Sequence, residues 1–336
     1  MKLFKWIKIL LVVLVILGLV LAYFYERFEP SKEFVWGLNF SSSRARELGL
    51  DPSHVYIDML EDLRPKYLRL PAYWNEIEPV DNQFKFGELD GQLDLAEKYG
   101  TEVILTMGKK APRWPECHEP AWVRELAPED QEKQELDMMR EVVGHFKDHP
   151  AITIWQVENE PLFDFGEDCD KMPRRFLKDA VALVKSIDSR PVLVTDSGEL
   201  GRWLPTATTG ADLFGTTMYR IVHNKYTGFF KYPLPPAFFR IKAGIVNTFA
   251  NPAPQRIIGV ELQAEPWVAD GIENATLDEQ KAMMNPKIFA DYTAYAKEAG
   301  FGENYLWGVE WWYWMAKKHN DWGMWGSAKE LLNPTK

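Results

Sequence analysis

The feature that most constrains the fold is a regular alternation of short β-rich runs with amphipathic helical segments. Eight runs have the length and composition of buried strands, at Phe34–Phe40, Tyr67–Leu70, Glu102–Met107, Thr153–Val157, Pro191–Thr195, Leu213–Met218, Ile257–Glu261 and Tyr305–Glu310. Five periodic helical segments lie between them, at Pro52–Leu63, Gly87–Tyr99, Pro128–His149, Arg174–Ile187 and Leu277–Ala299. This alternation predicts an α/β fold in which a parallel sheet closes into a (β/α)8 TIM barrel.

An open, doubly wound sheet is the alternative arrangement of the same elements. Such a sheet usually carries a glycine-rich phosphate-binding turn after its first strand, and residues 37–42 lack that pattern. The chain has 336 residues, 46% of them hydrophobic, which is long enough for one barrel of about 250 residues. We therefore expect one barrel domain over residues 35–336.

One connection departs from this rhythm. Residues 221–256 form a long aromatic stretch that contains Pro233, Pro235 and Pro236. Long ordered loops are usually functional, so we expect this stretch to form a wall of the cleft. A membrane-contacting patch is the alternative interpretation.

The N-terminal segment has a different character. Three lysines precede an uninterrupted apolar run over residues 9–25, which approaches the roughly 20 residues that cross a bilayer. We expect residues 1–8 to be a cytoplasmic basic tail, residues 9–25 a transmembrane signal anchor and residues 26–34 a linker, because the lysines orient the N-terminus inward. The predicted location is the cell membrane, single-pass, with the domain outside the cytoplasm. A cleaved signal peptide, which would give a secreted protein, is the alternative.

Charge and cysteine content limit the possible partners. The formal net charge of −10 argues against a nucleic-acid partner. Cys117 and Cys169 fall in loops expected on the same rim of the barrel, where an oxidising exterior permits a disulfide, with two unpaired thiols as the alternative. No zinc-type spacing of histidines or cysteines is present. We expect no metal and no cofactor.

Polar and aromatic residues gather where the strands end, which is where a barrel places its functional site. The fourth strand ends in Glu158-Asn159-Glu160-Pro161, and the seventh ends in Glu261, with Glu265 beyond it on the same side of an extended strand. Further such residues near strand ends are Arg69, His118, Tyr219, Glu310, Trp311, Trp312 and Trp314. Two carboxyl groups across one pocket are the minimal equipment for cleaving a glycosidic bond.

The Asn-Glu-Pro triplet closing strand four, together with a glutamate closing strand seven, resembles clan A of the glycoside hydrolases. The segment Leu70–Pro79 and the following Phe84-Lys-Phe are similar to cellulase-like family 5 and related β-glycanases and β-galactosidases. The resemblance covers nearly all of residues 34–320 in layout. It implies a retaining glycoside hydrolase that acts on β-linked oligo- or polysaccharides through two glutamates about 5 Å apart.

The resemblance also implies a role for each matching residue. Glu160 would be the general acid/base and Glu261 the nucleophile. The implied supporting roles are a ligand of the sugar 2-hydroxyl for Asn159, a positive charge that keeps the nucleophile ionised for Arg69, a hydrogen-bond donor to that nucleophile for Tyr219, and a stacking platform for Trp312. Glu265 is the alternative nucleophile or a substrate ligand, and no role follows for Glu310.

The sequence departs from family 5 at two positions, and it leaves alternatives open. Thr217 stands where the family often has a histidine, and His118 does not clearly match the family's strand-three histidine. Structural interpretations are a barrel ion pair for Glu158 or Arg69 and a core position for Tyr219. A membrane-anchored transglycosylase that remodels surface polysaccharide would use the same two glutamates. A non-catalytic glycan-binding barrel is disfavoured because both acids are present. We expect a monomer, and the sequence does not specify the sugar or the linkage.

Overall fold

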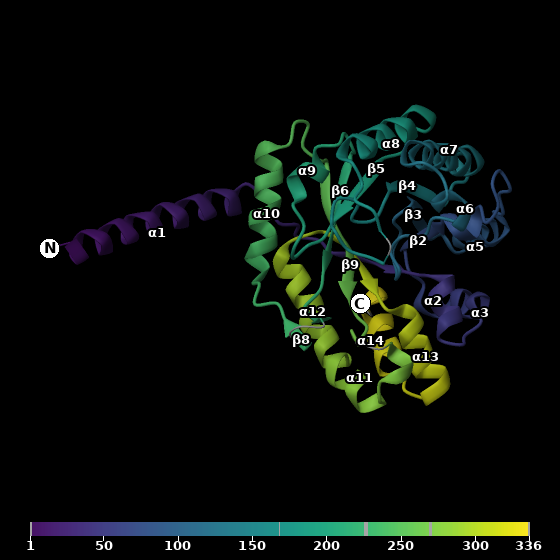
Figure 1. Ribbon diagram of the computed structural model, residues 1–336. Coiled ribbons are helices and arrows are strands. Elements are labelled where there is room, and N and C mark those ends of the chain that lie inside the picture. The colour runs from purple at the N-terminus through teal and green to yellow at the C-terminus, as the bar shows by residue number, and fades with distance from the viewer. Residues whose placement is uncertain (1, 168, 225–227, 269–270, 335–336) are drawn as a thin grey trace.

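The computed structural model describes residues 2–167, 169–224, 228–268 and 271–334. Eight parallel strands close into a barrel in the order β1-β10-β9-β6-β5-β4-β3-β2 (Figure 1). The barrel strands are β1 (Val35–Asn39), β2 (Tyr67–Tyr73), β3 (Glu102–Gly108), β4 (Ile152–Val157), β5 (Val192–Asp196), β6 (Leu213–Met218), β9 (Arg256–Gln263) and β10 (Glu303–Trp307). The predicted (β/α)8 TIM barrel is confirmed.

Helices surround the barrel and cover its outer face (Figure 1). The helices that precede β6 are α1 (Lys2–Glu26), α2 (Ser42–Glu47), α3 (Pro52–Asp58) with a π-helical extension (Met59–Leu63), α4 (Trp74–Ile77), α5 (Gly87–Tyr99), α6 (Ala121–Arg124), α7 (Pro128–Phe146), α8 (Arg174–Ile187) and α9 (Trp203–Ala207). Those that follow it are α10 (Pro236–Phe249), a 3-10 turn (Ile272–Asn274), α11 (Leu277–Met283), α12 (Pro286–Ala299), α13 (Val309–His319) and α14 (Gly323–Leu332).

The apolar core has two parts, as expected when strands alternate their side chains between two faces. The smaller part fills the barrel and consists of Ile104, Ile154, Leu193, Leu213, Ile258, Val260 and Tyr305, with Tyr67 packed against it. The larger part lies between the strands and the surrounding helices. The barrel is therefore a packed core, and its polar residues are left to the strand ends, where a site can form.

The eighth strand is shorter than predicted. It ends at Trp307 because Gly308 has a φ of 136°, a backbone conformation that L-residues rarely adopt. The chain then turns into α13, so Glu310 and the tryptophans after it lie on a helix and not at a strand end. The aromatic residues of this stretch are typical of a strand, but the backbone conformation of Gly308 ends the strand before them.

The long connection over residues 221–256 is more ordered than the sequence suggests. It contains an antiparallel hairpin, β7 (Ile221–Asn224) and β8 (Gly228–Lys231), followed by α10, which is the barrel helix between β6 and β9. Residues 225–227 lie outside the described residues. The segment predicted as one helix over Leu277–Ala299 is two helices, because Asn285 caps α12 and Pro286 begins it.

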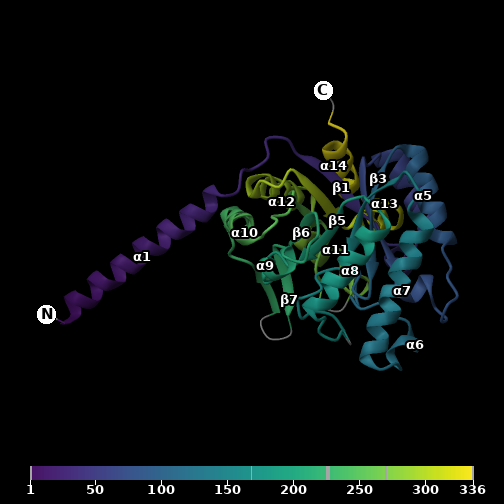
Figure 2. The same cartoon turned by 90° about the horizontal axis from the view of Figure 1, so that it is seen from above.

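Within the described residues, one helix is long and apolar enough to cross a membrane, over Phe4–Glu26 with a mean hydropathy of 2.9. In both views α1 extends away from the flank of the barrel that carries α10 (Figures 1 and 2). The predicted linker, residues 26–34, lies against the barrel. Phe28 packs on Phe301, and the Ser31 N–H donates to the Gly300 carbonyl (2.9 Å). Met1 and the last two residues lie outside the described part of the chain.

Candidate active site

A buried guanidinium, that of Arg69 on β2, organises the carboxyl end of the barrel. Its Nε donates to Gln156 (2.7 Å), its Nη1 to Glu261 (2.7 Å) and Asn39 (3.0 Å), and its Nη2 to Asn159 (2.8 Å). The side chain is fully buried, so these partners replace the water that the cation loses. Arg69 thereby ties β1, β2, β4 and β9 together at one point, which is the site and not the barrel bottom.

Glu261 on β9 receives two donors, one on each carboxylate oxygen. Arg69 contacts Oε1, and the Tyr219 hydroxyl donates to Oε2 (3.0 Å). A positive charge and a hydrogen bond both favour the ionised form of a carboxyl group. Burial, followed by the Glu261 charge, raises the pKa of Tyr219 well above its usual range, so the phenol stays a donor. Tyr219 therefore belongs to the site, although its ring also packs against Trp267.

Glu160 has the opposite environment. It lies just beyond β4, it is buried, and Oε1 accepts a hydrogen bond from the Thr217 hydroxyl (3.0 Å). Burial, followed by the charge of Glu261, raises the pKa of Glu160 well above its usual range. The two glutamates thus have different surroundings, as the acid and the nucleophile of one reaction must have.

Strand register and shared neighbours place Glu160 and Glu261 close together. Thr217 on β6 pairs directly with Glu261 on β9, and the Thr217 hydroxyl reaches across to Glu160. Paired residues of adjacent strands lie about 4.8 Å apart. From the other side, Arg69 contacts both Glu261 and Asn159, the residue before Glu160. Thr217, which stands where family 5 often has a histidine, thus contacts the Glu160 carboxyl group and is the strand-register neighbour of Glu261.

A third carboxyl group, which the sequence did not single out, joins this pair. Glu116, in the loop after β3, accepts a hydrogen bond from Asn159 Nδ2 (3.3 Å). Burial, followed by the charge of Glu261, raises the pKa of Glu116 to about 8. Lys110 balances part of this acidity, and its ammonium donates to the Glu160 carbonyl (3.1 Å). Both residues lie in a loop without strand or helix periodicity, so sequence patterns do not place them.

Glu265 belongs to a separate cluster beside the acid pair. It forms an ion pair with Arg113, and the same guanidinium binds Glu310 (2.6 Å) and lies 4.0 Å from the ring centroid of Trp307. Glu310, unassigned from the sequence, also accepts the Ser41 N–H (2.6 Å). Glu265 thus lacks the Arg69 and Tyr219 contacts that Glu261 has, which favours Glu261 as the nucleophile.

Trp312 does not fit the stacking role that the sequence predicts. Its side chain is fully buried on α13, where the indole N–H donates to the Ala264 carbonyl (2.7 Å) and the ring packs on Phe289. Trp307, the last residue of β10, lines a small cavity of about 10 Å³ with Arg69 and Arg113. The difference follows from the end of the eighth strand, which lies at Trp307 and not at Glu310.

Glu158, for which a barrel ion pair was the structural interpretation, binds backbone N–H groups among the described residues. Its carboxyl group accepts the backbone N–H groups of Lys109 (3.0 Å) and Lys110 (2.7 Å), and Glu135 of α7 shares the Lys109 N–H. Burial, followed by the neighbouring Glu135 charge, raises the pKa of Glu158. His118 is likewise structural, because it packs on Tyr73 and burial lowers its pKa to about 4.

A disulfide joins the loops after β3 and β4. Cys117 and Cys169 are bonded, with their Cα atoms 5.5 Å apart. The first loop carries Glu116 and the second follows directly from Glu160. The bond therefore holds together two loops that both contribute carboxyl groups to the site.

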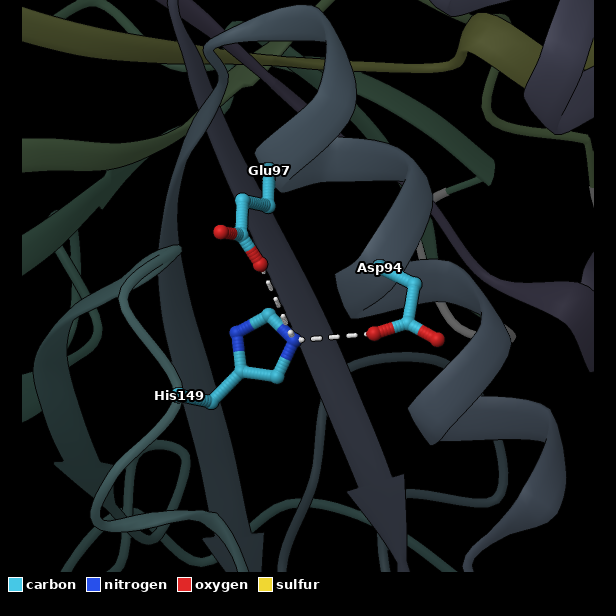
Figure 3. A group of neighbouring side chains, drawn as sticks. All are labelled: Asp94, Glu97 and His149. Carbon is cyan, nitrogen blue, oxygen red and sulfur yellow. Dashed lines mark hydrogen bonds and ion pairs between the residues drawn. The ribbon is translucent and has the colours of Figure 1, made fainter.

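One group of side chains has the composition of a metal site. Asp94, Glu97 and His149 face one another, with His149 Nε2 lying 3.4 Å from Asp94 and 4.0 Å from Glu97 (Figure 3). The other ring nitrogen, Nδ1, accepts the Ala151 N–H (3.3 Å), which leaves the ring proton on Nε2. A protonated Nε2 is a donor to carboxylates and not a metal ligand. The group precedes β4, at the end of the barrel opposite to the site.

Comparison with known proteins identifies similar barrels. Residues 90–236 match the family model described as glycosyl hydrolases family 2, TIM barrel domain. The match runs from α5 to the start of α10, so it includes Glu160 and stops before Glu261. A beta-galactosidase of Arthrobacter sp is 24% identical over 129 residues, which are 31% of this chain and 18% of that protein.

A second beta-galactosidase, from Clostridium cellulovorans, is 22% identical over 196 residues, which are 50% of this chain and 29% of that protein. The matched regions thus span less than a third of these relatives. Among solved structures, a glycoside hydrolase family 10 endo-beta-1,4-xylanase from Gloeophyllum trabeum has a TM-score of 0.58 at 16% identity, over 90% of this chain and 97% of that one. The matches support the resemblance to clan A and do not single out family 5.

The electrostatic coupling of the two acids gives a direct prediction. In Glu261→Gln, the pKa of Glu160 should fall, because the charge of Glu261 is the second-largest cause that raises it, after burial. Carbon NMR titration of labelled glutamate carboxyl groups measures this value. Glu303→Gln is the control, because Glu303 begins β10 at the far end of the barrel and should leave the Glu160 titration unchanged. An unchanged titration in Glu261→Gln would contradict the proximity argued above.

The two tryptophans should respond differently to removal. Trp312→Ala should lower the free energy of unfolding by about 3–5 kcal/mol, because it empties a fully buried site. Trp307→Ala should instead raise KM, by up to about tenfold, the equivalent of roughly 1.4 kcal/mol. Denaturant unfolding and glycoside kinetics on both variants separate the two effects. A larger rise in KM for Trp312→Ala than for Trp307→Ala would support Trp312 as the side chain that stacks on the sugar.

Proposed function

We propose that this protein is a retaining glycoside hydrolase of β-linked glycans, in which Glu160 is the acid/base and Glu261 the nucleophile. The observation that carries the proposal is the asymmetry of the pair. Glu261 binds a cation and a phenol, whereas Glu160 is buried beside the Glu261 charge and accepts only the Thr217 hydroxyl among its side-chain hydrogen bonds with described residues. That asymmetry is what double displacement at an anomeric carbon needs.

In the first step a Glu261 oxygen attacks the anomeric carbon and the bond to the leaving oxygen breaks. The proton on Glu160 passes to that oxygen, which leaves as an alcohol, and a sugar ester remains on Glu261. In the second step Glu160, now ionised, removes a proton from water. The hydroxyl attacks the same carbon, the ester bond breaks and Glu261 regains its charge. Two inversions give net retention of configuration.

The surrounding residues support both steps without taking part in bond changes. Arg69 and Tyr219 orient Glu261 and disperse the charge that returns to it. Asn159 directs its amide oxygen to Arg69 and its Nδ2 to Glu116, and we assign that Nδ2 donor to the sugar 2-hydroxyl. We assign the aromatic contact with the sugar to Trp307, because it lines a small cavity together with Arg69 and Arg113. Arg113 also forms an ion pair with Glu265.

We further propose that α1 anchors the enzyme as a single-pass protein, with residues 1–8 in the cytoplasm and the barrel over 35–336 outside. Support comes from the apolar length of α1 and from the disulfide, since such bonds persist in oxidising compartments. All the site residues come from one barrel, so a monomer suffices for the chemistry. A β-linked oligo- or polysaccharide is the proposed substrate, in line with the named activities of the beta-galactosidase relatives.

Acid variants test the mechanism. Glu160→Gln and Glu261→Gln should each lower kcat on an aryl β-glycoside by a factor of about 10³ or more, while circular dichroism and thermal unfolding show an intact fold. A dinitrophenyl leaving group should restore the first step, seen as a rapid burst of dinitrophenol, in Glu160→Gln only, because that leaving group departs without a proton. Steady-state turnover should stay low, because the second step still lacks its base. A screen that includes sugar acceptors would detect transfer products.

A 2-deoxy-2-fluoro glycoside should trap the ester, and peptide mass mapping should place the added mass on Glu261. Glu265→Gln is the matched control on the same connection and should still be labelled. A label on Glu265 would instead assign Glu265 as the nucleophile. Full activity in both Glu160→Gln and Glu261→Gln would remove the mechanism.

A further inference from the structure

The last turn of α1 is built into the barrel, and this contact is the starting observation. A Cβ atom added at Gly244 of α10 would collide with the carbonyl oxygen of Phe24, so the two backbones touch at a glycine. On one side of this point the Phe24 and Phe249 rings pack at 5.7 Å, and on the other the Arg240 guanidinium lies 3.8 Å from the Tyr25 ring centroid. Only the absence of a side chain at Gly244 allows this approach.

The chain after α1 stays on the barrel surface. Asn247 Nδ2 donates to the Arg27 carbonyl (3.2 Å), the Phe28 ring packs on Phe301 at 5.5 Å, and the Ser31 N–H donates to Gly300. The first barrel strand begins at Val35. A free tether would leave the barrel unoriented, whereas these contacts fix its position relative to α1.

The orientation that results places α10 across the end of the apolar helix. In Figure 1 α10 runs crosswise to α1, and in Figure 2 it meets the same end of α1. If α1 crosses a bilayer along its normal, α10 lies along the surface. Phe249 is 57% exposed and touches Phe24, at the end of the apolar run. It therefore sits at the depth of the membrane–water interface, which aromatic side chains prefer.

We propose that the flank of the barrel formed by α10 is a membrane-contacting surface that rests in the headgroup region of the bilayer that α1 spans. The occupant of this surface is phospholipid, because the surface is continuous with the end of α1. The inference rests on the proposed anchoring of α1 and goes beyond the proposed chemistry. It assigns the helix of the 221–256 connection to the membrane, while the ends of the barrel strands carry the site.

The direction of the cleft follows from chain topology. The chain leaves β6 at the carboxyl end of the barrel and enters β9 at the other end, so α10 runs antiparallel to both strands. With α10 along the surface, the barrel axis lies along the surface as well. The site therefore opens parallel to the bilayer surface, above the lipid headgroups, toward glycans that are attached to the membrane or lie on it.

Spin labelling of the full chain in phospholipid vesicles tests this surface. Both native cysteines are in the disulfide, so an introduced cysteine is the only free thiol. A nitroxide at Phe249→Cys should be more accessible to oxygen and less accessible to an aqueous nickel reagent than one at Lys133→Cys. Lys133 lies on α7, which faces away from α1 in both views (Figures 1 and 2).

A pair of glycine variants provides the matched comparison. Gly244→Leu should undock α1 and shift the nickel accessibility at position 249 to that of position 133. Gly144→Leu should not, because Gly144 is also a helical glycine but has open space around its Cβ position. Turnover of a soluble aryl glycoside should be the same in both, which shows that the barrel is folded and separates this inference from the catalytic proposal.

Several outcomes would overturn the proposal. Equal nickel accessibility at positions 249 and 133 in the parent chain would remove the surface, as would no response to Gly244→Leu. Dipolar broadening between labels at position 249 would assign the surface to a second copy of the chain. N-terminal sequencing that finds α1 removed would end the anchoring and this inference together, and would leave the glycosidase proposal standing.

Discussion

The structure depends on the burial of one cation at the mouth of the barrel. A guanidinium without water is costly unless all its donor positions are used, and Arg69 has hydrogen-bond partners on Nε, Nη1 and Nη2. Those partners come from three other strands. The requirement that they converge on Arg69 sets the positions of Glu261 and Asn159 more firmly than apolar packing could, since the apolar core is not specific in direction.

The backbone at the same end of the barrel is strained at Glu160 and at Glu158 beside it. Glu158 and Glu160 have φ values of 61° and 46°, in a region that non-glycine residues enter at a cost of about 1–3 kcal/mol each. The conformation persists because hydrogen bonds fix it on both sides. The carboxyl group of Glu158 binds two backbone N–H groups of the β3 loop, and the Glu160 N–H donates to Thr195 (2.9 Å). In this conformation the Glu160 carboxyl group accepts the Thr217 hydroxyl of β6 (3.0 Å).

The parts of the fold that repeat locally could be predicted from the sequence, and the parts that depend on distant partners could not. Strand runs and the carboxylates that end them have a local signal in the sequence. This signal predicted the barrel, and it predicted that Glu160 and Glu261 stand at strand ends. The place of Trp312 was wrong because the φ of one glycine, and not the aromatic pattern, ends the eighth strand. Arg113 and Glu116 lie in an irregular loop, and their partners are on other strands, so composition alone gives them no role.

The bond between Cys117 and Cys169 has a consequence for biogenesis. A cross-link that spans 52 residues restricts the unfolded chain by about 4 kcal/mol in the chain-entropy view. A barrel made in a reducing compartment would lack this restriction. The loops after β3 and β4 would then have to pack beside the site without a covalent link between them. The redox state of the compartment thus becomes part of how the mouth of the barrel is assembled, and heterologous production in a reducing cytosol would yield a chain with the same sequence but a less ordered entrance.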